Sequence, residues 1–176
     1  GEIKLSVSSD LKDIRPIVMG AIVRGVDTGA NTEEKEDFIQ TLMDHQEKLH
    51  MTLGRRREFA SIGVHDLSTL KPPFRVITVP SDFSFMPLAC SEEMTIERIL
   101  KEHPKGAEYS HLMDGMERFP VIIDSEDMVL SFPPIINGSH TTVHEGTKDF
   151  FIDVTGWDIR SCESCLLLVC LSMSER

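Results

Sequence analysis

The sequence lacks the features of a membrane or secreted protein. Its longest apolar run, from Cys165 to Leu171, is far shorter than the roughly 20 residues that span a bilayer. The chain does not open on a basic segment followed by an apolar stretch, as a secretory signal does. Four cysteines, three of them crowded between Cys162 and Cys170, do not form the framework of a disulfide scaffold. These absences predict a cytoplasmic protein with reduced thiols and no membrane contact.

Basic residues are also scarce. The chain has 18 Lys and Arg against 29 Asp and Glu, which gives a net charge of −11. Such a negative charge argues against a protein that binds nucleic acid along a broad basic face. Its 176 residues, 40% of them hydrophobic, are nevertheless enough to bury a core. We therefore expect a single domain over residues 1–176.

Common catalytic and metal-binding motifs are missing. No glycine-rich phosphate loop and no Gly-x-Ser-x-Gly nucleophile turn occurs in the chain. Cys162-x-x-Cys165 lacks a second pair, and His140 and His144 lie in a turn-rich loop rather than on a helix. We therefore predict no metal site. A metal-dependent hydrolase using His65, Asp66 or His140 stays open as a rival that needs further ligands.

Strand and helix patterns alternate irregularly along the chain. Asn31 and Glu34 predict the start of a helix with an apolar stripe from Phe38 to Leu53. An all-round apolar helix that starts after Asp158 is expected to be buried against a sheet. Further short helices are expected over residues 95–102 and 107–113, and strands at residues 3–7, 17–26, 59–64, 74–79, 120–123, 128–131 and 150–155. This order predicts an α+β fold with mixed or antiparallel β layers flanked by helices.

Three segments are candidates for chemistry. Gly63 is expected to loosen a turn that presents His65 and Asp66, and the alternative is a turn that Asp66 simply caps. Residues 129–138, with two prolines and an Asn-Gly pair, predict a rigid loop that presents backbone N–H groups, or a structural crossover. On the strand 150–155, Asp153 and Thr155 share one face. A carboxylate within an apolar strand is costly unless it is paired or faces a polar cavity.

These segments, in this order and spacing, resemble the editing domain of the phenylalanyl-tRNA synthetase β subunit of the archaeal and eukaryotic cytosolic type. The resemblance covers residues 14–173. The motifs that carry it are Arg15-Pro16, Gln46-Glu47-Lys48-Leu49-His50 with Arg55-Arg56-Arg57, Ile62 to Leu67, Phe119 to Ile122, Val129 to Gly138 and Phe151 to Gly156. The chain opens on Gly1 and stops inside an apolar helix, and we expect it to be a fragment of a longer β subunit.

The resemblance implies hydrolysis of tyrosine wrongly attached to the phenylalanine tRNA. A pocket built for phenylalanine cannot strongly reject an added hydroxyl, whereas a second pocket that must bond that hydroxyl discriminates in the opposite sense. It implies that Asp153 reads the phenolic hydroxyl in a pocket also lined by Ser131, Thr155 and Ile122. The candidates for the ester end, the ribose or an attacking water are His65, Asn137, Gly138 and Ser139. The candidates for a tRNA phosphate contact are Arg55, Arg56 and Arg57.

The resemblance also implies partners. These are the acceptor end of the phenylalanine tRNA carrying tyrosine, and a synthetase α subunit in a hetero-oligomer. No cofactor is expected in this domain, whereas ATP and Mg²⁺ are implied for the synthetase as a whole. The alternative is a domain that keeps the fold but only scaffolds the synthetase or binds an amino acid. Polar residues at positions 131, 153 and 155 favour the editing function, since a scaffold could replace them with apolar ones.

Overall fold

The computed structural model describes residues 3–174, which fold as two compact units. The first unit contains residues 3–16 and 70–142, and the second contains residues 17–69 and 143–174. Each unit combines helices with a β-sheet, so the predicted α+β class is confirmed. The single domain over residues 1–176 stays a prediction.

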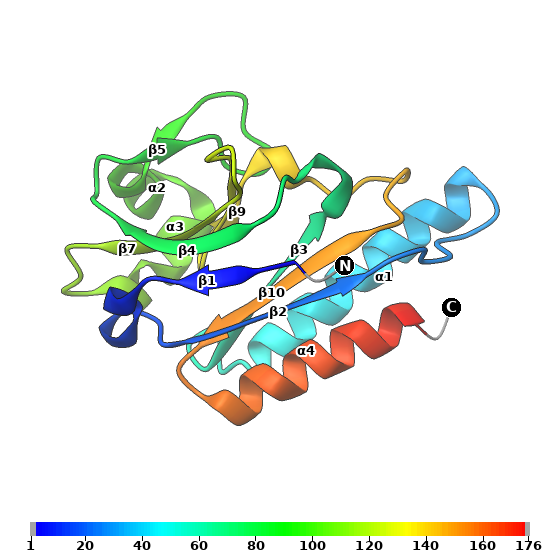
Figure 1. Cartoon of the computed structure of the whole chain (residues 1–176), viewed down its shortest axis with the longest axis horizontal. Coiled ribbons are helices and arrows are strands. Elements are labelled where there is room, and N and C mark those ends of the chain that lie inside the picture. The colour runs from blue at the N-terminus through cyan, green and yellow to red at the C-terminus, as the bar shows by residue number, and fades with distance from the viewer. Residues whose placement is uncertain (1–2, 175–176) are drawn as a thin grey trace. The chain divides into compact units, whose positions relative to one another are not determined.

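The second unit is built on a three-stranded antiparallel sheet with the order β2-β10-β3 (Figure 1). Its central strand is β10 (Phe150–Gly156), and the outer strands are β2 (Ile17–Val23) and β3 (Ala60–Asp66). β-Branched and aromatic residues, which suit a pleated surface, dominate β10. Every residue of β3 and β10 is buried.

Two helices, α1 (Thr32–Met51) and α4 (Ile159–Ser174), pack against the sheet of the second unit (Figure 1). The side chains that make this core include Phe38 and Leu42 of α1, Cys165 and Val169 of α4, and Phe150, Ile152 and Val154 of β10. The predicted cap is confirmed, because the Asn31 Oδ1 atom accepts a hydrogen bond from the Glu34 backbone N–H at 2.9 Å.

Burial of the two helices differs from expectation at their C-terminal ends. The expectation that α4 packs against the sheet is confirmed, but Leu167, Leu168 and Leu171 of this helix are exposed. Only one stripe of α4, formed by Cys162, Cys165, Val169 and Met173, reaches full burial. Leu53 does not extend the stripe of α1, because that helix ends at Met51. Helical periodicity places one stripe against a sheet, and the remaining apolar residues of α4 lie outside it.

The first unit contains a five-stranded mixed sheet. The β1–β4 pair is parallel and all other pairs are antiparallel. In sheet order its strands are β1 (Leu5–Val7), β4 (Phe74–Val79), β7 (Phe119–Ile123), β8 (Val129–Phe132) and β9 (Ile136–Asn137). The predicted β7–β8 hairpin is confirmed. The buried Asp124 carboxylate holds its turn by accepting from the Glu126 and Met128 backbone N–H groups at 2.9 and 3.0 Å.

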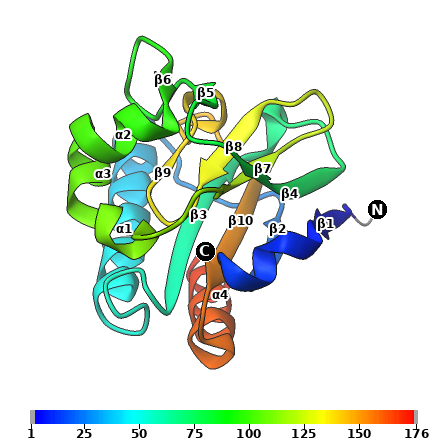
Figure 2. The same cartoon turned by 90° about the vertical axis from the view of Figure 1, so that its left-hand side faces the viewer.

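Two short helices of the first unit, α2 (Ile96–Glu102) and α3 (Pro104–Tyr109), lie side by side (Figure 2). The short helix predicted over residues 107–113 begins earlier, at Pro104, because proline is tolerated at a first helical position. The segment 81–95 adds the paired two-residue strands β5 (Ser84–Phe85) and β6 (Met94–Thr95). The 3₁₀ turns η1 to η4 span Ser9–Asp13, Leu67–Thr69, Ser110–Met113 and Ser139–Thr141. Between residues 3 and 174 no helix is long and apolar enough to cross a membrane.

Candidate functional site

A buried acid–histidine pair lies on the sheet of the second unit. The Asp153 Oδ2 atom is 2.5 Å from the His65 Nε2 atom, and the two side chains are 1% and 0% exposed. Asp153 belongs to β10 and His65 to β3, and the His65 ring stacks on Phe151 with a centroid distance of 5.9 Å. The sequence predicted both residues as site candidates. It placed His65 at a turn, whereas β3 continues through Asp66 and delivers His65 from a strand.

Glycines flank Asp153 on both neighbouring strands. The register pairs Asp153 with Gly63 of β3 and with Gly20 of β2. A Cβ atom at Gly63 would overlap the Asp153 Oδ2 atom and would lie 2.8 Å from the His65 Nε2 atom. His65 therefore reaches the carboxylate only because position 63 has no side chain. The role of Gly63 is to provide space and not to loosen a turn.

A second polar pair lies one step along the same strands. Thr155 pairs in register with Ser61, and their hydroxyl oxygens are 3.3 Å apart. Both residues are buried. Asp153 and Thr155 lie on one face of the sheet. The apolar residues Ile152 and Val154 lie on the other face and pack into the core. The predicted shared face is confirmed, and Ser61 is a member that the sequence analysis missed.

Three other predicted residues lie in a row in the first unit. Ser131 of β8 pairs with Ile122 of β7 on one side and with Asn137 of β9 on the other. Ser131 and Ile122 are buried. Their proximity follows from strand register, which brings together positions far apart in the chain.

The backbone N–H groups after this row are already bonded within the unit. The Gly138 N–H donates to the Leu130 carbonyl at 2.8 Å, and the Ser139 N–H donates to the Met86 carbonyl at 2.9 Å. A Cβ atom at Gly138 would overlap the Val129 carbonyl oxygen. The expectation that the 129–138 loop presents its N–H groups is therefore wrong for Gly138, whose N–H and missing side chain serve its packing against β8. The N–H group of the next residue, Ser139, is likewise occupied by Met86.

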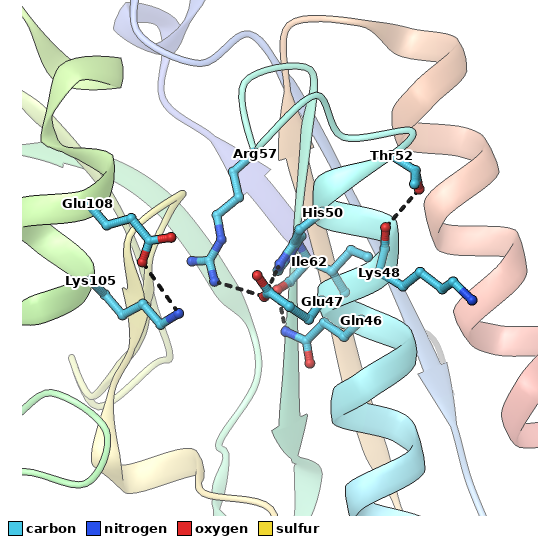
Figure 3. A network of polar contacts seen from close by, with 9 residues as sticks. All are labelled: Gln46, Glu47, Lys48, His50, Thr52, Arg57, Ile62, Lys105 and Glu108. Atoms are coloured by element: carbon cyan, nitrogen blue, oxygen red, sulfur yellow. Dashed lines mark hydrogen bonds and ion pairs between the residues drawn. The ribbon is translucent and has the colours of Figure 1, made fainter.

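A polar cluster at the C-terminal end of α1 is the main feature that sequence analysis missed (Figure 3). The Glu47 Oε2 atom lies 3.4 Å from the His50 Nδ1 atom and 3.5 Å from the Arg57 Nη2 atom. The His50 and Arg57 side chains are 2% and 10% exposed, whereas that of Glu47 is 47% exposed. His50 lies four positions after Gln46 and three after Glu47, and this helical spacing was the sequence signal for contacts to each of them. Figure 3 also shows the Lys105–Glu108 ion pair of α3.

The same cluster covers the outer edge of β3. The His50 Nε2 atom accepts a hydrogen bond from the Ile62 N–H at 2.8 Å, and the Gln46 Nε2 atom donates to the Ile62 carbonyl at 2.8 Å (Figure 3). Two side chains of α1 thus occupy the backbone groups that an edge strand leaves open to other chains. Because Nε2 accepts this bond, His50 is neutral and its Nδ1 atom carries the proton. Burial and the neighbouring Arg57 lower the pKa of His50 to about 4.

A strained turn delivers Arg57 to this cluster. Arg55, Arg56 and Arg57 have φ values of 48°, 54° and 71°, and left-handed backbone costs roughly 1–2 kcal/mol for a residue other than glycine. The Arg57 N–H donates to the His50 carbonyl at 3.2 Å and anchors the turn. Arg57 is buried beside Glu47, whereas the other two candidates for a phosphate contact, Arg55 and Arg56, are exposed. Conformational strain of this kind gathers at functional sites.

Asp66 and Cys165 have structural roles. Burial acts to raise the pKa of Asp66, but hydrogen bonds from Ser68 and Thr147 outweigh it and hold the pKa below its usual value. Asp66 caps the turn that follows β3, as the alternative interpretation predicted, through the Ser68 N–H at 2.9 Å. Cys165 is buried in the core, and burial raises its pKa to about 11. No group of three His, Cys, Asp or Glu in the described part of the chain could hold a metal ion.

Comparisons with known proteins place this arrangement in a family. Residues 15–164 match the family model of the B3/4 domain. The chain belongs to the B3/4 domain family. It is 46% identical over 175 residues to the phenylalanine–tRNA ligase β subunit of Methanosarcina barkeri, and 48% identical over 159 residues to that of Methanothrix thermoacetophila. These matches cover 99% and 90% of the chain but only 31% and 28% of the relatives.

A solved structure shows the same fold. It is an N-terminal fragment of the phenylalanyl-tRNA synthetase β subunit from Pyrococcus horikoshii, which is 40% identical with a TM-score of 0.93. The match covers all of this B3/4 domain chain and 49% of that fragment. The resemblance stated from the motifs is therefore confirmed.

We predict that Gly63→Ala destabilises the B3/4 domain by about 2 kcal/mol, because the new methyl group overlaps the Asp153–His65 pair. Urea unfolding measures this loss. In an Asp153→Ala background the cost of Gly63→Ala should be smaller by about 1 kcal/mol, since the overlapping carboxylate is gone. An equal cost in both backgrounds would contradict the assigned role of Gly63.

We also predict an acid-sensitive contribution from His50. Its pKa falls from 6.5 in the unfolded chain to about 4 in the folded domain, so the unfolded state binds more protons between these values. The contribution of His50 to the free energy of unfolding is therefore complete above about pH 6.5. It is lost as the pH falls towards 4, by up to roughly 3 kcal/mol.

The measurement compares urea unfolding of the B3/4 domain at pH 7 and pH 4.5 with that of His50→Gln, which does not titrate and keeps an acceptor for the Ile62 N–H. The difference between the two proteins isolates His50 from the other titrating groups. We expect the variant to lose less stability than the parent on acidification. Parallel pH profiles would refute the prediction.

Proposed function

We propose that this B3/4 domain hydrolyses tyrosine from mischarged phenylalanine tRNA, as the editing part of a phenylalanine–tRNA ligase β subunit. The observation that carries the proposal is the Asp153 carboxylate, buried on a central strand, bonded to His65 and flanked by two glycines. Asp66 and Asp124 are buried too, but their carboxylates accept backbone N–H groups at turns. Asp153 lies in the middle of a strand, where a buried carboxylate is costly even when it is paired. A hydroxyl-reading pocket does need one.

Selectivity follows from the hydrogen bonds of Asp153. One carboxylate oxygen, Oδ2, is held by His65, and we assign the phenolic hydroxyl of tyrosine to the carboxylate as its second donor. Phenylalanine would fill the same space and leave that acceptor unpaired. Sites built to bond a hydroxyl reject the analogue that lacks it far more strongly than apolar pockets reject an added group. Because its Nε2 atom is taken by Asp153, His65 acts as a positioning residue here and not as the activator of a water.

Hydrolysis of the ester is assigned to a water molecule. Glu47 is the carboxylate of this unit best suited to orient it, because two buried groups, His50 and Arg57, hold Glu47 while its side chain stays half-exposed. A positioned carboxylate of this kind typically contributes 10²–10⁴-fold to a hydrolytic rate, as an order of magnitude. The strain of the turn at Arg55 to Arg57 supports a functional role for this geometry.

The partners follow from the same proposal. They are the aminoacylated acceptor end of the tRNA and a synthetase α subunit, in the cytoplasm and with no cofactor in this domain. Arg55 and Arg56 are exposed and stay candidates for a phosphate contact. With a net charge of −11, the domain itself does not hold the tRNA along a broad surface.

The first test is deacylation of Tyr-tRNA and Phe-tRNA by the synthetase that carries this chain. Asp153→Ala should lower the rate on Tyr-tRNA by at least about a hundredfold and abolish the preference over Phe-tRNA. Asp37→Ala removes an exposed carboxylate of α1 and serves as the matched control. If Asp153→Ala keeps both the rate and the preference, the domain is a scaffold or a binding module and the proposal fails.

The second test distinguishes the role of Glu47 at the ester bond from the role of Asp153 in the pocket for the tyrosine side chain. Glu47→Gln should lower kcat about a hundredfold on Tyr-tRNA while the preference for tyrosine is kept, because the pocket at Asp153 is unchanged. Glu36→Gln, on an exposed position of the same helix, is the control. An unchanged kcat for Glu47→Gln would remove Glu47 from the mechanism without affecting the assignment of Asp153.

A further inference from the structure

A short segment of the first unit, residues 86–90, lies along the outer edge of β9. We call these five residues the edge segment. The Leu88 N–H donates a hydrogen bond to the Asn137 carbonyl at 2.9 Å, and the Met86 carbonyl accepts one from the Ser139 N–H, also at 2.9 Å. The edge segment therefore continues the five-stranded sheet of the first unit beyond its last strand.

These bonds hold Asn137 from the side that β8 does not cover. Strand β9 has only two residues, and β8 pairs with one of its edges. Asn137 lies in register with Ser131, and Ser131 lies in register with Ile122. Residues paired in this way have neighbouring side chains on one face of a sheet. The edge segment thus fixes the outer end of the row of candidate residues in the first unit.

A tight turn gives the edge segment a defined shape. The Cys90 N–H donates to the Pro87 carbonyl at 3.0 Å and closes a four-residue turn. Its third residue, Ala89, has a φ of 63°, in the left-handed region that residues other than glycine rarely adopt. Pro87 forms an antiparallel bridge with Gly138, so the turn begins at the sheet. Backbone held in such a conformation by its surroundings gathers at functional sites.

Core packing anchors the residue that precedes the edge segment. Phe85 is buried, and its ring packs edge-on against that of Phe132 with a centroid distance of 6.5 Å. Phe132 of β8 is in turn the register partner of Ile136, the residue before Asn137. The edge segment is therefore fixed to β8 and β9 both by packing and by backbone bonds.

We propose that the edge segment positions Asn137 for hydrolysis of the aminoacyl ester. The side-chain amide of Asn137 offers both donors and an acceptor, which suit the ester or the ribose of the tRNA end. Leu88 acts through the Asn137 backbone and is a positioning residue. A displacement of about 1 Å at a reacting group can lower a rate about a hundredfold, so one backbone bond is enough to matter. The inference rests on the proposed function and adds a residue that the assignments of Asp153 and Glu47 do not use.

The test replaces Leu88 by proline in the complete synthetase that carries this chain. Leu88 is the second residue of its turn, where proline is favoured, so Leu88→Pro removes the N–H donor and keeps the turn. Leu88→Ala keeps the donor. Ser125→Pro is the matched control, because Ser125 is the second residue of the turn at 124–127 and its N–H donates to the Lys71 carbonyl at 2.9 Å. Ala89→Val, which a left-handed backbone disfavours, is the second variant in case Leu88→Pro does not fold.

Two readouts are compared. Hydrogen exchange followed by mass spectrometry reads the positioning, and Leu88→Pro should exchange severalfold faster than the parent in the peptide 136–139. Hydrolysis of Tyr-tRNA reads the function, and Leu88→Pro should lower kcat at least about tenfold with KM unchanged within about twofold. Leu88→Ala and Ser125→Pro should keep the parental values in both readouts.

An Asn137→Ala background distinguishes positioning of Asn137 from a general structural defect. Leu88→Pro should have little further effect on kcat in that background, because the residue through which it acts is already gone. An equal fold loss in both backgrounds would overturn the proposal. A parental kcat for Leu88→Pro or for Asn137→Ala, or unchanged exchange at 136–139, would also overturn it. A parent that does not hydrolyse Tyr-tRNA would instead refute the proposed function, and this inference with it.

Discussion

A carboxylate in the middle of a β-sheet is the constraint on which this structure depends. Asp153 is on the central strand of its sheet, where an unpaired charge would be costly. The carboxylate is paired with His65 of the neighbouring strand, whose side chain reaches across Gly63 to bond it. Three positions on two strands must agree for this to work. The pair is therefore a property of the strand register and not of any one residue.

Strand β3 connects this pair to the second polar cluster. One of its faces carries Ser61, Gly63 and His65, which adjoin Thr155 and Asp153 of β10. Its outer edge presents the Ile62 backbone, which Gln46 and His50 of α1 bond in place of a further strand. One of these two side chains, His50, also contacts Glu47, which in turn contacts Arg57. In this unit, protection of a sheet edge and construction of a candidate site use the same helix turn.

The distribution of charge qualifies the role proposed for tRNA. Of the three consecutive arginines after α1, the structure buries Arg57 against Glu47 and leaves Arg55 and Arg56 exposed. The exposed cations are too few to offset the acidic surface of the domain. Under the proposed function, a larger assembly would deliver the substrate, and this domain would read its aminoacyl end. The negative net charge argues against a broad tRNA contact on this domain, but it does not exclude the tRNA as a partner.

Local sequence determined the elements and their class. Alternation predicted β10 and the shared face of Asp153 and Thr155, and a capping residue predicted the start of α1 at Asn31. These features depend on neighbours within a few positions. The motifs around Ile62 to Leu67 and Val129 to Gly138 carried the family resemblance for the same reason, since their residues are adjacent in the chain.

Only the tertiary structure decided what those residues touch. The bond from His65 to Asp153, the space at Gly63 and the pairing of Ser61 with Thr155 all join β3 to β10, about ninety positions apart in sequence. The burial of Arg57 and the neutral state of His50 depend on how α1 packs against β3. Apolar content alone overstated the burial of α4, because a helix presents only one stripe to a sheet. Composition and periodicity fix what a segment can form, whereas register and packing fix which side chains meet.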